Sequence, residues 1–170
     1  MKPLVFDSTP LIYLTKAGLS RIFKELDGEK LTPPIVKSEV VDAGKNKGLP
    51  DALVLDRLFL NGVFKVCEPT DRKLLNRLLS TYGLHVADAE VLAFAHEHAG
   101  IAVMDDEVGR KTAKVYEIEY AGSTYVLMRA VCEGLVSKAK AKQAVNEMVS
   151  LGWRCSLESY IKILEAFEKL

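Results

Sequence analysis

The chain has 170 residues, 49% of them hydrophobic, and a formal net charge of zero, which predicts one domain with a sizeable core and argues against disorder. No apolar run approaches the roughly 18 residues of a membrane span, and no basic segment followed by an apolar stretch marks a signal peptide. We therefore expect a cytoplasmic protein without a membrane partner. The balanced charge excludes a strong, non-specific nucleic-acid binder, so a nucleic acid must be held by a local patch or through metal ions.

Short apolar runs alternate with helical patterns, which predicts a mostly parallel sheet covered on both faces. In chain order we expect a strand at 4–6, helices at 10–17 and 19–26, a strand at 30–32, a helix at 35–42, a polar mobile loop at 43–49, a helix at 53–60, a strand at 63–67, helices at 72–79 and 87–99, a strand at 101–104, a helix at 110–116, a strand at 118–121 and a helix at 123–133 that Ser123 caps. The predicted fold class is α/β, a three-layer α/β/α arrangement around a five-stranded sheet.

The pattern changes after Gly134. Two amphipathic helices, at 138–150 and 156–170, follow with no strand between them and are joined by the sequence LGWRC. We interpret residues 1–134 as the main domain and residues 135–170 as a helical hairpin that packs on that domain or binds another protein. Trp153 is expected in the core of the hairpin.

Acidic residues stand at the ends of two predicted strands. Asp7 follows the first strand, and Asp105 and Asp106 follow the fourth. In an open parallel sheet the functional crevice lies at the carboxyl ends of the strands, where the strand order reverses. If these two strands are neighbours, acids that are distant in the sequence converge on one cleft.

Two further acids stand on predicted helices near that edge. Asp88 opens the helix before the fourth strand, where the positive helix end stabilises a carboxylate. Glu39 lies in the helix after the second strand, on the face of Ile35 and Val36. Glu90, two residues after Asp88, points about 200° away from it on the helix and is not expected to share the site.

Several carboxylates in one cleft suppress each other's ionisation unless cations accompany them. The hard cations Mg²⁺ and Mn²⁺ take oxygen ligands and serve phosphodiester hydrolysis. The clustered acids therefore indicate a divalent-metal site.

Four segments, VFDSTPLI, PIVKSEVVDAG, ADAEVLAFA and VMDDEVGRKTA, contain these acids. In order and spacing they resemble the four acidic motifs of PIN-domain ribonucleases. The similarity is greatest to the PIN subgroup whose third motif reads Gly-Glu-Ala-Glu and whose fourth reads Asp-Asp, and it extends to GWRCS near the C-terminus. Two departures stand out: Ser8 and Thr9 replace the usual threonine and serine, and GLHVADAE replaces an Asp-Pro-Gly-like turn, which leaves the role of Glu90 open.

The resemblance implies a site of named residues. Its implied Mg²⁺ or Mn²⁺ ligands are Asp7, Glu39, Asp88 and Asp106, with Asp105 as a fifth ligand. Ser8 and Thr9 match the hydroxyl residues that orient the first acid or a metal-bound water. The implied activity is metal-dependent ribonuclease activity, in a toxin of a toxin–antitoxin pair or in RNA processing. RNA, an antitoxin protein and a second copy of the chain in a homodimer are the implied partners.

Ordinary structural roles stay open for the same residues. Asp7 and Asp88 stand where helix caps are common, Glu39 can be a solvated helix residue, and one acid of the Asp105–Asp106 pair is expected to be a turn or cap residue. Arg110, one helical turn after Asp106, is expected to meet the scissile phosphate or to anchor Asp106. His85 is interpreted as a solvent-facing loop residue, with substrate contact as the alternative.

Two other functions remain as alternatives. Haloacid-dehalogenase-like phosphatases also place an aspartate after the first strand and an Asp-Asp pair after a later one. They usually carry a second aspartate two residues after the first, where this chain has Thr9, and they leave Glu39 and Asp88 without a role. The third alternative is a non-catalytic PIN-like scaffold whose helical tail binds protein.

Overall fold

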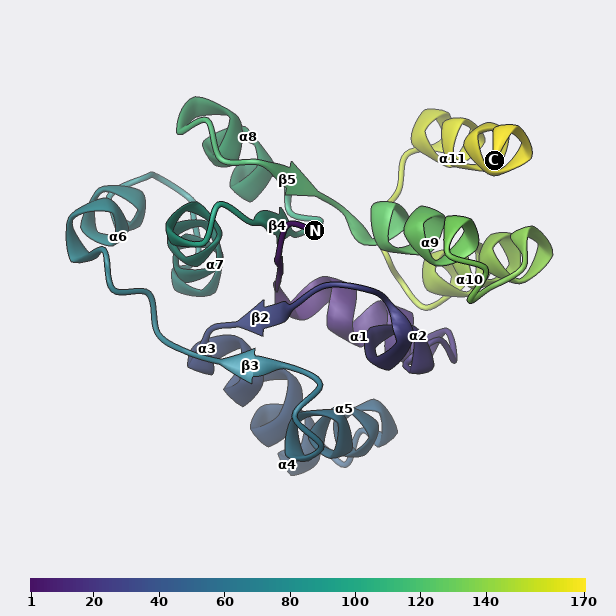
Figure 1. Ribbon diagram of the computed structural model, residues 1–170, viewed down its shortest axis with the longest axis horizontal. Coiled ribbons are helices and arrows are strands. Elements are labelled where there is room, and N and C mark those ends of the chain that lie inside the picture. The colour runs from purple at the N-terminus through teal and green to yellow at the C-terminus, as the bar shows by residue number, and fades with distance from the viewer.

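Five parallel strands form the centre of the protein in the computed structural model, which describes residues 1–170 (Figure 1). They are β1 (Leu4–Phe6), β2 (Lys30–Thr32), β3 (Lys65–Val66), β4 (Ile101–Val103) and β5 (Tyr120–Ala121). Their order in the sheet is β3-β2-β1-β4-β5, and every neighbouring pair is parallel. The predicted α/β class with a five-stranded sheet is confirmed. The first and fourth strands are neighbours, which meets the condition for the acids after them to converge.

Helices occupy most of the remaining chain. They are α1 (Ser8–Lys16), α2 (Arg21–Glu25), α3 (Pro34–Lys37), the π-helical turn η1 (Ser38–Ala43), α4 (Gly44–Asn46), α5 (Pro50–Leu60), α6 (Arg72–Leu79), α7 (Val86–Glu97), α8 (Glu107–Val115), α9 (Ser123–Cys132), α10 (Lys138–Ser150) and α11 (Leu157–Lys169). Side-chain caps begin four of them, from Asp71, Asp106, Ser137 and Ser156. Each cap satisfies a backbone N–H that has no partner within the helix.

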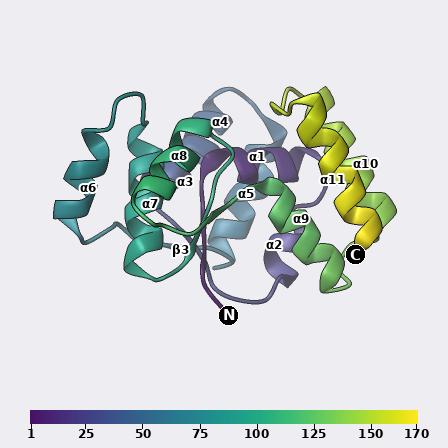
Figure 2. The same cartoon turned by 90° about the horizontal axis from the view of Figure 1, so that it is seen from above.

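The helices form a layer on each side of the sheet (Figures 1 and 2). On one side α7 contacts β1 and β4, and α6 and α8 pack beside it. On the other side α1 contacts α5, α9 and α10. The strands read as continuous apolar segments, LVF in β1 and IAV in β4, because both faces of the sheet are covered.

The C-terminal hairpin of α10 and α11 lies against the second layer. Helix α10 packs on α1 and α9, and α11 packs on α10. Val145, Met148 and Phe167 are buried and belong to the same hydrophobic cluster as the strands. The loop between the two helices returns to the sheet edge and buries Trp153, which is only 7% exposed. Trp153 is therefore buried, but in the main core and beside Asp105 rather than in a separate core of the hairpin.

Several local predictions differ from the structure, and β5, predicted at 118–121, covers only two residues. Residues 44–46 form α4 and not a mobile loop, because Gly44 lies so close to Ala52 of α5 that a Cβ atom at Gly44 would stand 2.6 Å from the Ala52 side chain. The polar sequence conceals this packing. Ser123 does not cap α9, since its hydroxyl donates to Asp105, and β3 covers two residues where five were predicted. No helix is both long and apolar enough for a membrane span.

Candidate active site

The carboxyl ends of β1 and β4 lie side by side and bring acids from distant segments to one edge of the sheet. Val5 pairs with Ala102 and Phe6 with Val103, so Asp7 and the loop after β4 leave the sheet at the same level. From β1 the chain first adds β2 and β3 on one side of the sheet, and then β4 and β5 on the other side. The strand order therefore reverses between β1 and β4. This is the position at which doubly wound sheets hold their ligands.

A pocket of about 400 Å³ opens at this edge. Its lining contains Asp7, Ser8, Thr9, Ile35, Glu39, His85, Val86, Ala87, Asp88 and Asp106. Four carboxylates thus share one pocket, contributed by the end of β1, by η1, by the first turn of α7 and by the loop after β4. Lysine and arginine are absent from this lining.

Each acid is held differently. Asp7 and Asp88 are each 5% exposed, and Asp7 makes no capping bond although it precedes α1. Asp106 caps α8 by accepting a hydrogen bond from the Gly109 N–H at 2.8 Å through one of its carboxylate oxygens. Glu39 projects from η1 and accepts a hydrogen bond from the Ser8 hydroxyl at 2.5 Å.

Burial and mutual repulsion disturb the titration of the two buried acids. Burial, then the carboxylate of Asp88 and to a smaller degree Glu39, raises the pKa of Asp7 from 3.8 to about 7, while the N–H groups of Ser8 and Thr9 act in the opposite direction. Burial and then Asp106 raise the pKa of Asp88 to about 6, with His85 opposing. The four acids are therefore close enough to repel one another, which is the environment that a divalent cation stabilises.

The side chains are not arranged as a finished coordination sphere. No group of three or more histidine, cysteine, aspartate or glutamate side chains in this structure is positioned so that it could hold a metal ion. The donor chemistry nevertheless fits a hard cation, since the pocket supplies carboxylate and hydroxyl oxygens and lacks thiols. Glu39 and Asp106 are the exposed members of the four acids, and Asp7 and Asp88 the buried ones.

Residues 3–169 match the family model DUF3368, which is described as a PIN domain. This chain belongs to the PIN-domain family. PIN domains are in general nucleases that use divalent metal ions. No curated protein matches the chain.

Asp105 of this PIN domain, which the resemblance implied as a fifth metal ligand, accepts hydrogen bonds from other side chains. Oδ1 accepts hydrogen bonds from Arg110 Nη2 at 3.0 Å and from the Ser123 N–H at 2.9 Å. Oδ2 accepts from the Ser123 hydroxyl at 2.5 Å and from Trp153 Nε1 at 2.9 Å. A carboxylate offers about four lone-pair sites, and all of them are used. In this structure Asp105 is therefore a structural acid without capacity for a metal ligand.

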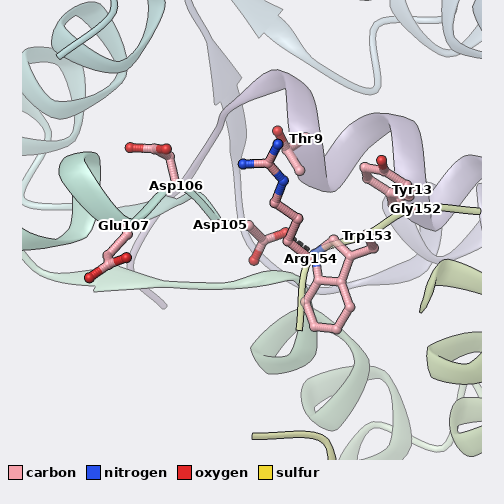
Figure 3. A pocket seen from close by; sticks show the side chains of 8 residues that line it. All are labelled: Thr9, Tyr13, Asp105, Asp106, Glu107, Gly152, Trp153 and Arg154. Carbon is pink, nitrogen blue, oxygen red and sulfur yellow. Dashed lines mark hydrogen bonds between the residues drawn. The ribbon is translucent and has the colours of Figure 1, made fainter. Parts of the chain in front are cut away.

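Figure 3 shows the division between the two neighbouring acids: Asp105 points to Trp153, whereas Asp106 points away from it. Arg110 follows Asp105. It pairs with that carboxylate and donates through Nε to the Met104 carbonyl at 3.0 Å. Of the two roles predicted for Arg110, it does not anchor Asp106, and contact with the scissile phosphate stays a prediction. Asp106 combines two roles that the sequence presented as alternatives, because it caps α8 and lines the acidic pocket.

Three other residues complete the account of the sequence predictions. Ser8 orients Glu39 and not the first acid. His85 is exposed, as predicted, and it also lines the acidic pocket beside Asp88, so contact with a substrate stays a prediction. Glu90 lies outside the pocket lining and interacts with Glu68 and Arg72, as its helical position predicted.

A second pocket adjoins the acidic one. It has a volume of about 400 Å³, and its lining contains Thr9, Tyr13, Asp105, Asp106, Glu107, Gly152, Trp153 and Arg154. Thr9 and Asp106 belong to both linings. No spacing rule connects residues 152–154 with Asp7, and the only sequence signal for this contribution is the resemblance of GWRCS to the PIN subgroup.

Replacement of Gly122 by alanine tests how tightly the Asp105 cluster is packed. A Cβ atom at Gly122 would stand 2.7 Å from Asp105 Oδ1 and would collide with the Arg110 guanidinium. Overpacking of this kind costs about 1–3 kcal/mol. We expect urea unfolding to show such a loss, and an unchanged unfolding midpoint would mean that Arg110 swings away without cost.

Proposed function

We propose that this PIN domain is a metal-dependent ribonuclease that hydrolyses phosphodiester bonds of single-stranded RNA, with Mg²⁺ or Mn²⁺ held by Asp7, Glu39, Asp88 and Asp106. The observation that carries the proposal is the crowding of these four carboxylates in one pocket without a neutralising lysine or arginine. The setting that we propose is a toxin or an RNA-processing enzyme of the cytoplasm, in which a homodimer or an antitoxin protein accompanies the chain.

The chain's own residues have distinct tasks in this proposal. The buried pair Asp7 and Asp88 supplies carboxylates that ionise fully only when a cation is bound, because burial and mutual repulsion raise both pKa values. The more exposed Glu39 and Asp106 complete the set. Ser8 holds the Glu39 carboxylate. A bound Mg²⁺ or Mn²⁺ supplies Lewis acidity toward the phosphate and lowers the pKa of water. Thr9 offers a hydroxyl to the substrate or to ordered water at the junction of the two pockets.

The phosphatase alternative receives little support from the site. Its general acid needs a carboxylate two residues after Asp7, where Thr9 presents only a hydroxyl. Glu39 and Asp88 share the pocket with Asp7, which the nuclease proposal uses and the phosphatase does not.

Purified protein with Mn²⁺ and end-labelled single-stranded RNA provides the first test. We expect cleavage that EDTA abolishes, and a loss of at least about 100-fold for Glu39→Gln, because even residues that only support metal ligands contribute 10–100-fold. Asp42→Asn is the matched control, since Asp42 is an exposed acid of the same π-helical turn outside the pocket.

The other outcomes separate the alternatives. Hydrolysis of para-nitrophenyl phosphate without RNA cleavage supports the phosphatase. Cleavage of single-stranded DNA but not of RNA overturns the substrate class. Inertness toward all three substrates, with folded protein and bound Mn²⁺, supports the scaffold.

A further inference from the structure

The second pocket continues the acidic pocket along one side. Its lining meets that of the acidic pocket at Thr9 and Asp106, and on the far side it reaches the C-terminal loop. Tyr13 of α1 and residues Gly152–Arg154 of that loop face the same space (Figure 3). A chain of nucleotides with one phosphate among the four acids therefore places a neighbouring nucleotide in this second pocket.

Arg154 supplies a free positive charge there. Its side chain is exposed, it takes part in none of the ion pairs of the protein, and Figure 3 shows its guanidinium beside Thr9. Arg110, the other arginine near the site, is already paired with Asp105. The four acids repel a polyanion, and with a net charge of zero the chain has no general attraction for RNA to offset this.

The position of Arg154 is fixed by its neighbours. Trp153 is 7% exposed, donates through Nε1 to Asp105 at 2.9 Å and through its backbone N–H to the Met148 carbonyl at 2.8 Å. Gly152, with φ of +99°, makes the turn that allows this approach. The backbone that carries Arg154 is thus tied to the loop that carries Asp106, so the guanidinium is presented from a rigid support.

We propose that Arg154 is a substrate-positioning residue that binds the RNA phosphate next to the scissile one, and that the second pocket is the subsite for that nucleotide. Arginine presents five donors in a planar fork that suits phosphate oxygens. Tyr13 adds an aromatic ring and a hydroxyl to the same subsite, which suit the base or the ribose of single-stranded RNA. This inference rests on the proposed ribonuclease function.

The first experiment measures binding without turnover. Asp7→Asn protein in EDTA is titrated with fluorescein-labelled single-stranded RNA over a range of salt concentrations, with and without Arg154→Ala. We expect Kd to rise about tenfold, as for loss of one hydrogen bond to a charged group. The slope of log K against log salt should fall by about 0.7, the value for one phosphate contact on a single strand. Arg154→Lys should keep most of the slope.

Arg57→Ala is the matched control, because Arg57 is exposed, takes part in no ion pair and lies on α5, away from both pockets. It should leave Kd and slope unchanged. The inference is overturned if Arg154→Ala and Arg57→Ala have the same Kd and the same salt slope. Equal unfolding midpoints for the two variants exclude a folding defect.

Steady-state kinetics with Mn²⁺ then separate the subsite from the proposed function. If the wild-type protein cleaves no RNA, the proposed function fails. If it cleaves, Arg154→Ala should raise KM and leave kcat nearly unchanged, since the contact is made equally in the ground state and the transition state. A fall in kcat at constant KM places Arg154 on the reacting phosphate and overturns the neighbouring subsite.

A scan with uncharged methylphosphonate linkages locates the phosphate. One substitution beside the mapped cleavage position should weaken binding by the parent protein and have little further effect on Arg154→Ala, because both changes remove the same contact. Additive losses at every linkage contradict the assignment.

Discussion

Replacement of Asp7 by asparagine is expected to abolish RNA cleavage and, at the same time, to make the metal-free protein more stable at pH 8. Asp7 is 5% exposed and lies among like charges, so its ionised form is costly in the folded state. Asparagine has nearly the same shape and removes the charge. It cannot serve as an anionic ligand, so the change that helps the fold removes the proposed chemistry.

The sign of the pH dependence follows from the raised pKa. Well below pH 3.8, Asp7 is protonated in both the folded and the unfolded chain, and its ionisation does not affect stability; at pH 4 only a small part of the effect is present. As the pH rises from 3.8 to about 7, the unfolded chain loses the proton while the folded protein retains it, so the free energy of unfolding falls. A shift from 3.8 to about 7 corresponds to a loss on the order of 4 kcal/mol above pH 7.

Urea unfolding in EDTA at pH 4 and pH 8 measures this difference. Wild type and Asp7→Asn should be alike at pH 4, and the variant should be more stable at pH 8. Mn²⁺ at 100 times its Kd should stabilise the wild type by about 2.7 kcal/mol and the variant by much less. A variant that is less stable than the wild type at pH 8 would show that Asp7 is stabilised by contacts of its ionised form, and the crowding argument would be wrong.

Replacement of Asp105 by alanine is expected to lower the stability of the protein strongly, whereas Asp7→Asn is expected to raise it. Its side chain is 7% exposed and accepts hydrogen bonds from Arg110, from Ser123 and from Trp153. Removal of one partner from a buried charged network costs about 3–5 kcal/mol because the other groups are left without partners. Since the Arg110 side chain is 38% exposed and can be hydrated, we expect about 3 kcal/mol.

Two companion variants identify the source of that loss. Trp153→Phe removes the indole donor together with one buried ring. It should cost at least about 1.5–3 kcal/mol, the usual range for a hydrogen bond to a charged group, with a further loss from the cavity. Glu107→Ala removes an exposed acid that pairs only with Lys111 and should leave the unfolding midpoint unchanged. If Asp105→Ala unfolds at the same urea concentration as wild type but no longer binds Mn²⁺, then Asp105 is a ligand after all, and our interpretation of the network is wrong.

The convergence of the acids was predictable because it follows from the sheet. Asp7 and Asp106 stand at the ends of apolar runs, and parallel neighbouring strands bring such ends to one edge. The orientation of Asp88 and Glu90 on opposite faces of α7 also follows from the helical repeat. These inferences needed only local periodicity and one topological rule.

The choice between Asp105 and Asp106 was not predictable in the same way. Both acids follow β4, and the deciding contact comes from Trp153, 48 residues later. The same bond holds the backbone next to Arg154 at the pocket, while Arg110 is held by the other oxygen of Asp105 and by the Met104 carbonyl. Such long-range contacts leave no periodic signal in a single sequence, and neither does the close approach of Gly44 to Ala52, which turns a polar segment into helix α4.

The position of β1 between β2 and β4 affects when the site can form during synthesis on the ribosome. The first strand emerges early but gains its second neighbour only after Ile101–Val103 has been synthesised, and Trp153 fixes the adjoining loop later still. The half-made polypeptide thus lacks the assembled acids. A cutting activity of the kind proposed therefore requires that segments as far apart in the sequence as Asp7 and Asp106 have both been synthesised and have paired through β1 and β4.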